Sequence, residues 1–261
     1  MPDPENRGRL KRFLLFLLGV ALLPALCALA LAVYDIIPGM FSSRPPFVAK
    51  EPLAVFIGYA VWTLIFIFLP PSTKMYVWGH ELTHAAWGLL TGSKIGKIKV
   101  SESGGYVNLS NPGIFTTLAP YFVPFYLVIV LLLRWVAGLI WDMEPYALYW
   151  LVLVGAAYGF HITYTIRSLA ERQPDIKEYG HFISYVLILL INILVFGYGV
   201  VAVTPTPVFE YHAAIVARGE EAYRYTGEQI AEDARAAKRA MQGIKPWFPI
   251  LKFIRRMRLN G

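Results

Sequence analysis

Long stretches with few or no charges alternate with short polar ones along most of the chain. Six apolar runs cover residues 13–33, 52–69, 75–90, 113–133, 146–166 and 182–203. A helix needs roughly 17–25 mainly apolar residues to cross a bilayer. The runs have about that length, so the sequence predicts an all-α membrane protein with a bundle of about six transmembrane helices. The first run is too long for the apolar part of a secretory signal peptide, and we expect it to be retained.

The connection between the third and fourth runs has a different pattern. Polar and apolar residues alternate over residues 97–100, Ser103, Gly104 and Gly105 favour a turn, and residues 106–109 resume the extended pattern. This order is typical of a β-hairpin, which we predict near residues 94–110 as a small insertion in the bundle. A plain polar loop is the alternative interpretation.

The fourth run contains Pro120 and Pro124. A proline inside a helix leaves backbone carbonyls without their usual amide partners. In a membrane these carbonyls must be satisfied by neighbouring helices or by water in a cavity. We therefore expect this helix to be kinked, with the kink facing protein rather than lipid.

Beyond residue 203 the chain becomes polar. Residues 209–242 are rich in Ala, Glu, Arg and Lys and predict one helix that is solvated or lies on the membrane surface. Residues 250–258 mix apolar and basic side chains, which is typical of an interfacial anchor; a disordered basic tail is the alternative. We divide the chain into an N-terminal region with two transmembrane helices (1–72), a core with four membrane segments (73–204) and a cytoplasmic basic helical tail (205–261).

The composition agrees with a membrane protein. Of the 261 residues 57% are hydrophobic and 16% are charged, and the mean hydropathy is +0.51. Soluble domains contain about 25% charged residues, so the charge is too sparse for an ordinary globular surface. The single cysteine, Cys27, excludes an intrachain disulfide and a cysteine-rich metal site.

The net charge of +7 is concentrated near the two ends of the chain. Four basic residues precede the first apolar run, and ten follow residue 203. Six spans would place both ends on one side, and basic flanks favour the cytoplasm. We therefore expect an integral protein of the plasma (cytoplasmic) membrane with both termini in the cytoplasm. Because the charges flank predicted spans, they indicate membrane lipids rather than nucleic acid as partners.

Residues 80–84, inside the third run, read His-Glu-Leu-Thr-His. Histidines four residues apart lie on one face of a helix, so His80 and His84 can bind one Zn²⁺. Glu81 points slightly away from that ion and can act as a general base towards water. The alternative is a polar trio that only hydrogen-bonds neighbouring helices. Ionisable side chains inside a span are costly and usually functional, which favours the metal site.

At residues 80–92, which read HELTHAAWGLLTG, the sequence resembles the site-2 protease family of intramembrane zinc metalloproteases. The glycine-containing hairpin and the proline-bearing helix extend this resemblance over about residues 76–190. It implies one zinc ion per chain and a site-2-protease-like core whose site opens to the cytoplasmic side. It also implies hydrolysis of transmembrane or membrane-anchored protein substrates, and an aspartate as the third metal ligand.

The position of the third ligand is less clearly marked. The family's usual Asp-Gly pair is missing, and the nearest match is Asp175, within the sequence Gln-Pro-Asp-Ile. A depth count at 1.5 Å per residue, with the third and fifth runs taken as parallel helices, instead favours His161. Asp175 fits only if the polar residues 171–173 fold the chain back into the bundle. We predict Asp175 as the third ligand, with His161 as the alternative, and a non-ligating His161 can orient Asp175 or a substrate.

The predicted hairpin offers an edge to which an extended substrate segment can add as a strand. Asn108 and Asn111, just after that edge, can steady the substrate backbone or an oxyanion, although ordinary turn chemistry is the favoured explanation for both. Two other functions are open: an inactive scaffold that binds and regulates membrane partners, and a transporter of protons or metal. The intact Glu81 argues against the first, and the lack of paired broken helices argues against the second.

Overall fold

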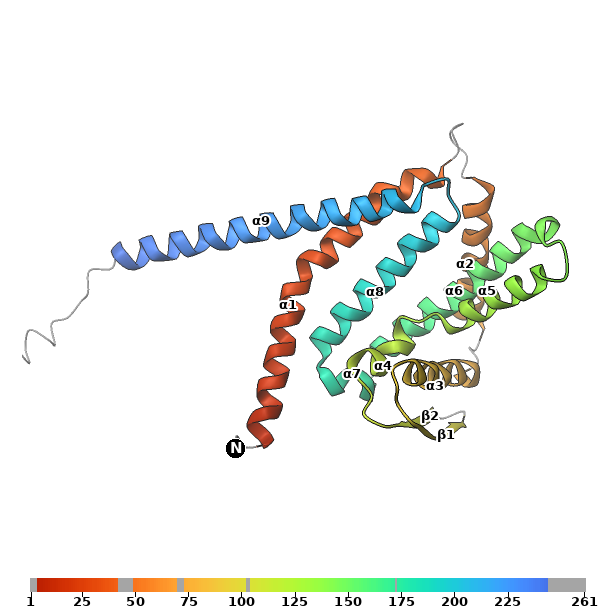
Figure 1. Cartoon of the computed structure of the whole chain (residues 1–261), viewed down its shortest axis with the longest axis horizontal. Helices are drawn as coiled ribbons and strands as arrows, with labels where there is room; N and C mark the ends of the chain where they lie inside the picture. The colour runs from red at the N-terminus through yellow and green to blue at the C-terminus, as the bar shows by residue number, and fades with distance from the viewer. Residues whose placement is uncertain (1–3, 42–48, 70–72, 102–103, 172, 244–261) are drawn as a thin grey trace, which may run out of the picture.

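The computed structural model describes residues 4–41, 49–69, 73–101, 104–171 and 173–243, and the chain is mostly helical (Figure 1). The α-helices and strands are α1 (Pro4–Ile36), α2 (Lys50–Phe68), α3 (Thr73–Leu90), β1 (Ile95–Ser101), β2 (Gly104–Leu109), α4 (Ile114–Leu118), α5 (Phe125–Gly138), α6 (Ala147–Ala170), α7 (Pro174–Tyr179), α8 (His181–Ala202) and α9 (Val208–Gly243). Short 3-10 helices are η1 (Ile37–Met40), η2 (Ala119–Tyr121) and η3 (Glu144–Tyr146). The predicted anchor at residues 250–258 lies outside the described residues.

Several helices are long and apolar enough to cross a membrane. Four of them cover Gly8–Met40, Lys50–Phe68, Glu144–Ala170 and His181–Ala202. The pair Ile114–Tyr121 and Phe125–Gly138, bent by 77°, adds a fifth if both halves belong to one span. The described residues thus have the helices expected of an all-α membrane protein, with four or five candidate spans where the sequence predicted about six.

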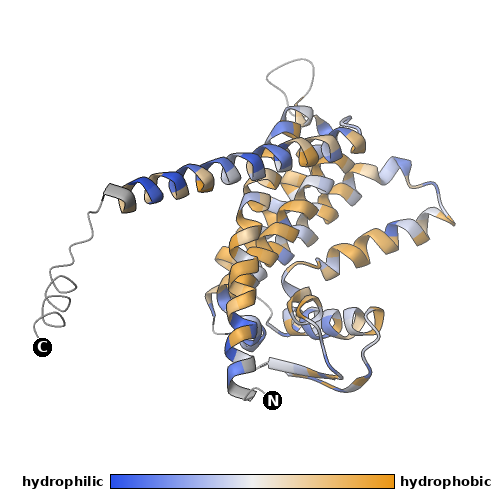
Figure 2. Ribbon diagram, turned by 60° about the vertical axis from the view of Figure 1, so that its left-hand side comes forward, coloured by the Kyte–Doolittle hydropathy of each residue, from blue (hydrophilic) through white to orange (hydrophobic). Residues whose placement is uncertain are grey.

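The predicted third span accounts for the difference. Residues 73–90 do form a helix, α3, but it is not among the helices apolar enough to cross a membrane. Lys74, His80, Glu81 and His84 all lie on it and lower its hydropathy. Figures 1 and 2 show α3 lying across one end of the bundle, beside the hairpin, instead of running along the other long helices. The helix predicted here is confirmed, whereas the hydropathy of α3 does not support the predicted span.

Helices α2 and α6 pack closely and run in the same direction. Gly58 approaches Val152, and further along both helices Trp62 Nε1 donates a hydrogen bond to Thr163 Oγ1 at 3.1 Å. A Cβ on Gly58 or on Gly155 would overlap a backbone carbonyl of the facing helix. Small residues of this kind let membrane helices approach closely. The parallel direction matters for the path of the chain, because the segment between α2 and α6 must return to the starting side of the bundle.

Helices α1 and α8 form a second parallel pair. Phe16 packs on Phe182 near the start of α8, with ring centroids 5.1 Å apart. Val33 and Val200 belong to one buried cluster near the far ends of both helices. Contacts that advance together along two helices define a parallel packing, so α1 and α8 also begin at the same end of the bundle.

The C-terminal helix α9 packs on α1 and then leaves the bundle. The Arg218 guanidinium binds the Asp35 carboxylate at 2.8 and 2.9 Å, and the Tyr223 hydroxyl donates to the Ala21 carbonyl at 2.9 Å. Figures 1 and 2 show the second half of α9 as a largely hydrophilic helix that extends away from the other helices. The single helix predicted over residues 209–242 is confirmed.

The predicted hairpin is also confirmed. Strands β1 and β2 pair antiparallel in a two-stranded sheet, with Ile98 opposite Val107 and Val100 opposite Gly105. The ladder is irregular between Ile95 and Ile98. Both strands pack against α3, so the hairpin covers the helix that carries the His-Glu-x-x-His pattern.

The predicted kink lies between α4 and α5 and faces protein. Pro120 and Tyr121 are buried, and the carbonyl of Tyr121 accepts a hydrogen bond of 2.8 Å from Asn192 Nδ2 on α8. Pro124 has no backbone N–H, so the helical ladder is interrupted here. A side chain from a neighbouring helix therefore satisfies a carbonyl at the break, as the two prolines predicted.

Candidate metal centre

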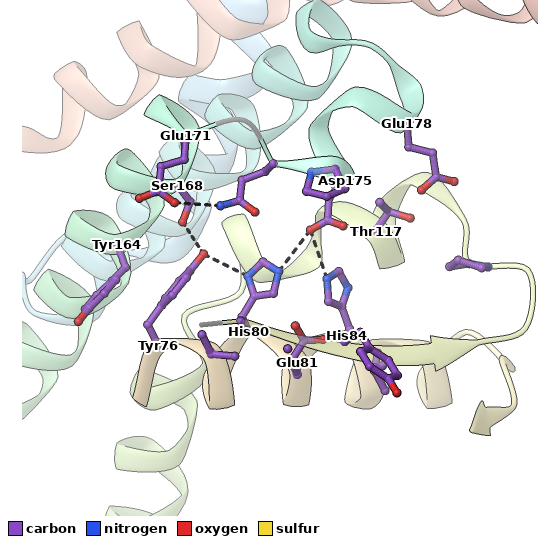
Figure 3. A pocket seen from close by; sticks show the side chains of 18 of the residues that line it. Tyr76, His80, Glu81, His84, Thr117, Tyr164, Ser168, Glu171, Asp175 and Glu178 are labelled. Atoms are coloured by element: carbon purple, nitrogen blue, oxygen red, sulfur yellow. Dashed lines mark hydrogen bonds and ion pairs between the residues drawn. The ribbon is translucent and has the colours of Figure 1, made fainter. Parts of the chain in front are cut away.

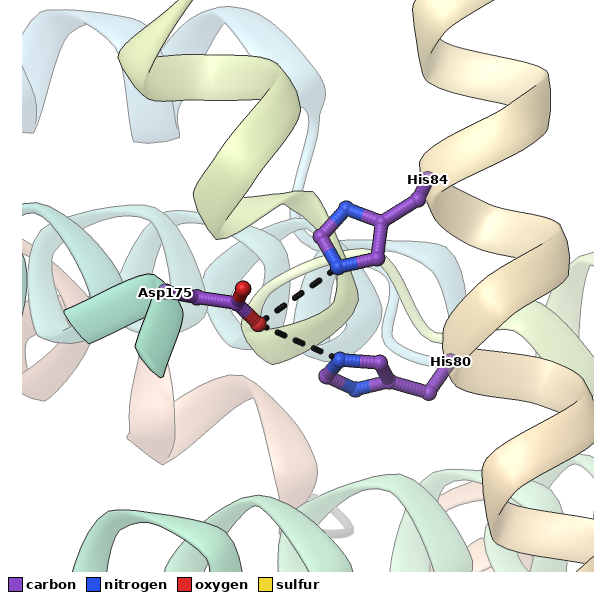
Figure 4. Close-up of side chains that lie close together, drawn as sticks. All are labelled: His80, His84 and Asp175. Carbon is purple, nitrogen blue, oxygen red and sulfur yellow. Dashed lines mark hydrogen bonds and ion pairs between the residues drawn. The ribbon is translucent and has the colours of Figure 1, made fainter. Parts of the chain in front are cut away.

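The candidate centre joins one face of α3 to the first turn of α7. His80 and His84 project from adjacent turns of α3 towards Asp175, as Figures 3 and 4 show. Pro174 is the first residue of α7, a position where the fixed φ of proline suits a helix start. At the other end of α7, Gly180 has φ +101° and allows the chain to turn directly into α8. The short helix thus brings the carboxylate back to the bundle.

The three side chains offer donor atoms at distances that suit a metal ion. Asp175 Oδ2 lies 3.3 Å from His80 Nε2 and 3.5 Å from His84 Nε2. One donor atom from each residue lies within 4.8 Å of the other two. A tetrahedral zinc site with N and O ligands at 2.0–2.2 Å has ligand atoms about 3.4 Å apart. The two measured distances agree with two edges of that tetrahedron.

A backbone carbonyl fixes a proton on Nδ1 of His84. His84 Nδ1 lies 3.0 Å from the carbonyl oxygen of Thr116 and donates a hydrogen bond to it, because a carbonyl can only accept. In the neutral form of the imidazole, Nε2 is then the unprotonated nitrogen and is available as a metal ligand. A nitrogen lone pair and a carboxylate oxygen repel each other unless a cation or a proton lies between them. This arrangement is the one that metal-binding histidines adopt.

His80 is held from its other ring nitrogen. The Tyr76 hydroxyl lies 3.2 Å from His80 Nδ1 and also contacts Ser168 Oγ on α6. When His80 Nδ1 donates to Tyr76, the tyrosine hydroxyl can donate to Ser168, and His80 Nε2 is left free as a ligand. Tyr76 precedes His80 by one helical turn, so this partner comes from the same face of α3.

Asp175 is the charged member of the group. Burial raises the pKa of its carboxyl, but the neighbouring His80 and His84 imidazoles outweigh burial and hold the pKa below its usual range. The Tyr121 hydroxyl donates a hydrogen bond of 3.0 Å to the Oδ2 atom of Asp175 that faces the two imidazoles. The carboxylate is therefore ionised at neutral pH and supplies the negative charge that a divalent cation needs.

Glu81 lies beside the three donors without belonging to their group. Its residue is only 6% exposed, and it lies beneath strand β2, where a Cβ on Gly105 would come within 2.7 Å of Glu81 Cγ. Burial raises the pKa of the Glu81 carboxyl to about 7. A carboxylate with a pKa near the working pH is suited to act as a general base.

A pocket of about 710 Å³ opens over the four residues. It lies between α3, the end of α6, α7 and strand β2 (Figure 3). All six residues of β2, from Gly104 to Leu109, line it, so the whole strand borders the space above the candidate centre. Arg167, Glu171 and Glu178 make its rim polar.

His161 is placed elsewhere. Its Nε2 lies 3.1 Å from Asn192 Oδ1, and among the described residues the group that could hold a metal ion consists of His80, His84 and Asp175. The depth count that favoured His161 took α3 and α6 as parallel spans. Because α3 lies across the bundle, depth along α6 does not measure distance from His80 and His84.

The structure places Asn108 and Asn111 in different environments. Asn108 lies on β2 and lines the pocket, whereas Asn111 is exposed, lies outside the pocket lining and has φ +49°. That left-handed conformation is typical of Asn in turns. Asn108 therefore stays a candidate substrate contact, and Asn111 has the features of a turn residue.

Three residues at the centre were not predicted from the sequence. Tyr76 has a local signal, because it lies four residues before His80 on the same helix face. Tyr121 and Gly105 have none, because each meets the centre only through the tertiary packing of the break and of the hairpin.

No family model, curated protein or solved structure matches this chain. The functional interpretation therefore depends on the residues and geometry described above.

Proposed function

We propose that this chain is a zinc metalloendopeptidase of the site-2 protease type that hydrolyses peptide bonds of transmembrane or membrane-anchored proteins. One observation carries the proposal: His80, His84 and Asp175 converge at the spacing of a metal site, with Glu81 beside them. Two imidazoles and a carboxylate are a donor set that suits Zn²⁺ and leaves a coordination position free for catalysis.

Each residue of the candidate centre has its own role in the proposed peptide hydrolysis. His80, His84 and Asp175 would hold the ion, which when bound would lower the pKa of water and polarise the scissile carbonyl. Glu81 takes the proton from the attacking water and later passes it to the leaving amine. Burial beneath β2 raises the pKa of the Glu81 carboxyl to about 7. With that pKa the carboxyl can both accept and release a proton near neutral pH, as the two transfers require.

Strand β2 supports an extended mode of substrate binding. Its consecutive residues border the pocket, so the strand presents backbone groups as well as side chains to that space. An unwound substrate segment can add alongside β2 and place its scissile bond over the metal. Asn108 is the β2 side chain best suited to bind the substrate backbone.

The packing also supports a membrane arrangement of five crossings. Because α2 and α6 are parallel, the chain between them must cross the bilayer an odd number of times. The bent segment α4–α5 supplies one crossing and α3 supplies none. The N-terminus and the pocket then share one side, and α9 lies on the other. This proposal replaces the expectation that both termini lie in the cytoplasm.

The distribution of basic residues favours the cytoplasm for the pocket side. Residues 1–12, 70–112 and 167–180 contain eleven Lys or Arg, whereas residues 34–51 and 134–146 contain three. The basic residues of the C-terminal tail carry little weight, since the rule applies within about 15–20 residues of a span. In residues 203–222 the only Lys or Arg is Arg218.

The decisive test of the proposed reaction uses Glu81→Gln. The variant should bind zinc as the wild type does, because Glu81 is outside the donor group, yet cleavage should fall by roughly 100-fold or more, since a positioned base contributes about 10²–10⁴-fold. Both proteins are reconstituted in liposomes with a library of single-spanning peptides, and cleavage is followed by mass spectrometry. Equal cleavage by the two proteins would exclude Glu81 as the base.

A further inference from the structure

Tyr121 lies behind the candidate metal centre, on the side away from the pocket. Its residue is fully buried, and it is not among the residues that line the pocket over Glu81. Its hydroxyl nevertheless donates to Asp175 Oδ2 at 3.0 Å. This is the same oxygen that faces His80 and His84. Tyr121 can therefore act on the ligand set without touching a substrate.

The backbone of Tyr121 is held by a polar contact unusual for a helical segment. Its carbonyl lies at the break before Pro124 and accepts a hydrogen bond of 2.8 Å from Asn192 Nδ2. Asn192 Nδ2 also donates to the Ile188 carbonyl at 2.8 Å. Both partners of this nitrogen are acceptors, so the orientation of the amide is determined.

The orientation of Asn192 assigns a role to His161. With Nδ2 donating to two carbonyls, Oδ1 of Asn192 is directed to His161 Nε2 at 3.1 Å. An amide oxygen only accepts, so His161 Nε2 carries the proton and donates. His161 is 7% exposed. A buried histidine on α6 thus fixes an asparagine on α8, which in turn fixes the backbone of Tyr121.

The ring of Tyr121 is fixed from the side of α3. It packs edge-on against His80, with ring centroids 5.4 Å apart. Its hydroxyl, ring and carbonyl are therefore each held by a different element: α7, α3 and α8. A hydroxyl held in this way has little freedom to turn from Asp175.

We propose that the string His161–Asn192–Tyr121 positions the third metal ligand, with Tyr121 holding Oδ2 of Asp175 towards the two imidazoles. This inference rests on the metal site of the proposed function. It gives each ligand its own partner: Tyr76 for His80, the Thr116 carbonyl for His84 and Tyr121 for Asp175. Such partners orient ligands and raise their affinity for metal. Tyr121 is a positioning residue, and it differs from the other two partners in acting on the charged ligand.

Tyr121→Phe tests the proposal, with Tyr126→Phe as the matched control. Tyr126 belongs to the neighbouring helix α5, and its hydroxyl donates to the Met75 carbonyl at 2.6 Å, so the control also loses one phenol hydrogen bond, here to a backbone carbonyl outside the candidate centre. Zinc affinity of the full-length protein is measured by competition with a chelator. We expect a loss of roughly 10–100-fold for Tyr121→Phe, the usual effect of removing such a partner, and a smaller change for Tyr126→Phe.

Two further measurements separate positioning from a general loss of stability. The melting temperature of each metal-free variant reports stability alone. The visible absorption of bound Co²⁺ reports coordination, and it should weaken in Tyr121→Phe, because a carboxylate released from Tyr121 can bind through both oxygens and raise the coordination number. Tyr126→Phe should keep the wild-type Co²⁺ spectrum.

The outcomes are distinct. Equal zinc affinity and equal Co²⁺ spectra in the two variants would overturn the role of Tyr121 and leave the metal site intact. A wild-type protein that binds neither zinc nor Co²⁺ would overturn the metal site, and this inference with it. If Tyr121→Phe does not fold, Asn192→Ser is used, and an unchanged zinc affinity in that variant would likewise overturn the proposal.

Discussion

The donors of the candidate centre come from two segments that lie far apart in the chain. His80 and His84 could be predicted together, because four-residue spacing on a helix places two side chains on one face. Glu81 followed from the same local pattern. Asp175 could be proposed only through a family resemblance, and a count of depth along the helices favoured His161 instead. Local spacing determines local geometry, whereas the third donor depends on how α7 folds back, which the sequence pattern alone does not determine.

Substitutions of Asp175 and His161 test which of the two residues is the third metal ligand. Asp175→Asn should weaken zinc binding by more than the roughly 10–100-fold expected for loss of a supporting partner, because it removes the charged donor. His161→Gln should have a smaller effect, since the glutamine amide can still donate to Asn192. Zinc affinity by chelator competition measures both. Tight binding in Asp175→Asn combined with loss of zinc in His161→Gln would assign the third ligand to His161.

For helices and strands, the periodicity of the sequence predicted more of the structure than it did for the individual residues of the site. The alternating residues 97–100 and the glycines after them predicted the hairpin, and the two prolines predicted the break between α4 and α5. Helix α3 was recognised as a helix, but its length was taken as evidence for a span. Its polar residues lower the gain from burial in lipid, and the structure has it lying across the bundle (Figure 1). The periodicity of the sequence predicts whether a segment is a helix or a strand, whereas the direction in which that helix or strand lies in the bundle depends on tertiary packing.

The contact between β2 and Glu81 gives the prediction for the hairpin. A Cβ on Gly105 would lie 2.7 Å from Glu81 Cγ, 2.9 Å from Glu81 Oε1 and 2.9 Å from the Lys99 carbonyl. Gly105→Ala must therefore displace the carboxyl or the strand. We expect cleavage to fall by about tenfold or more, as for a misplaced catalytic group, while zinc content stays unchanged.

Gly113→Ala is the control for this variant, because a Cβ there meets no atom within 4 Å. Its cleavage rate should match the wild type. Full activity in Gly105→Ala would show that the close packing of β2 on Glu81 is not needed for the reaction.

For the whole molecule, the number of crossings decides which sides the two termini occupy. The apolar runs alone predicted six membrane crossings, and an even number of crossings places both termini on the same side of the membrane. The structure offers four or five candidate spans among the described residues, and the parallel pair α2 and α6 favours five. Hydropathy could predict which segments are apolar, but the relative direction of helices far apart in the chain needed the tertiary contacts.

Tags at residue 5 and at residue 243 should therefore be found on opposite sides of the membrane. The first should be protected from protease added outside intact cells, and the second should be accessible, because the proposed arrangement has five crossings between the N-terminus and α9. A tag inserted between strands β1 and β2 should behave as the N-terminal tag does. Both terminal tags on one side would require an even number of crossings and contradict this arrangement.

The central claim is that His80, His84 and Asp175 form a zinc site in a membrane-embedded protein. The most direct measurement is the zinc content of protein purified without chelators, determined by elemental mass spectrometry alongside protein concentration. The proposed zinc site predicts one equivalent per chain in the wild type and in Glu81→Gln, and none in His84→Ala, which removes a donor but leaves Glu81 in place. A wild-type protein that holds no zinc, even after incubation with excess zinc and removal of the unbound ion, would contradict it.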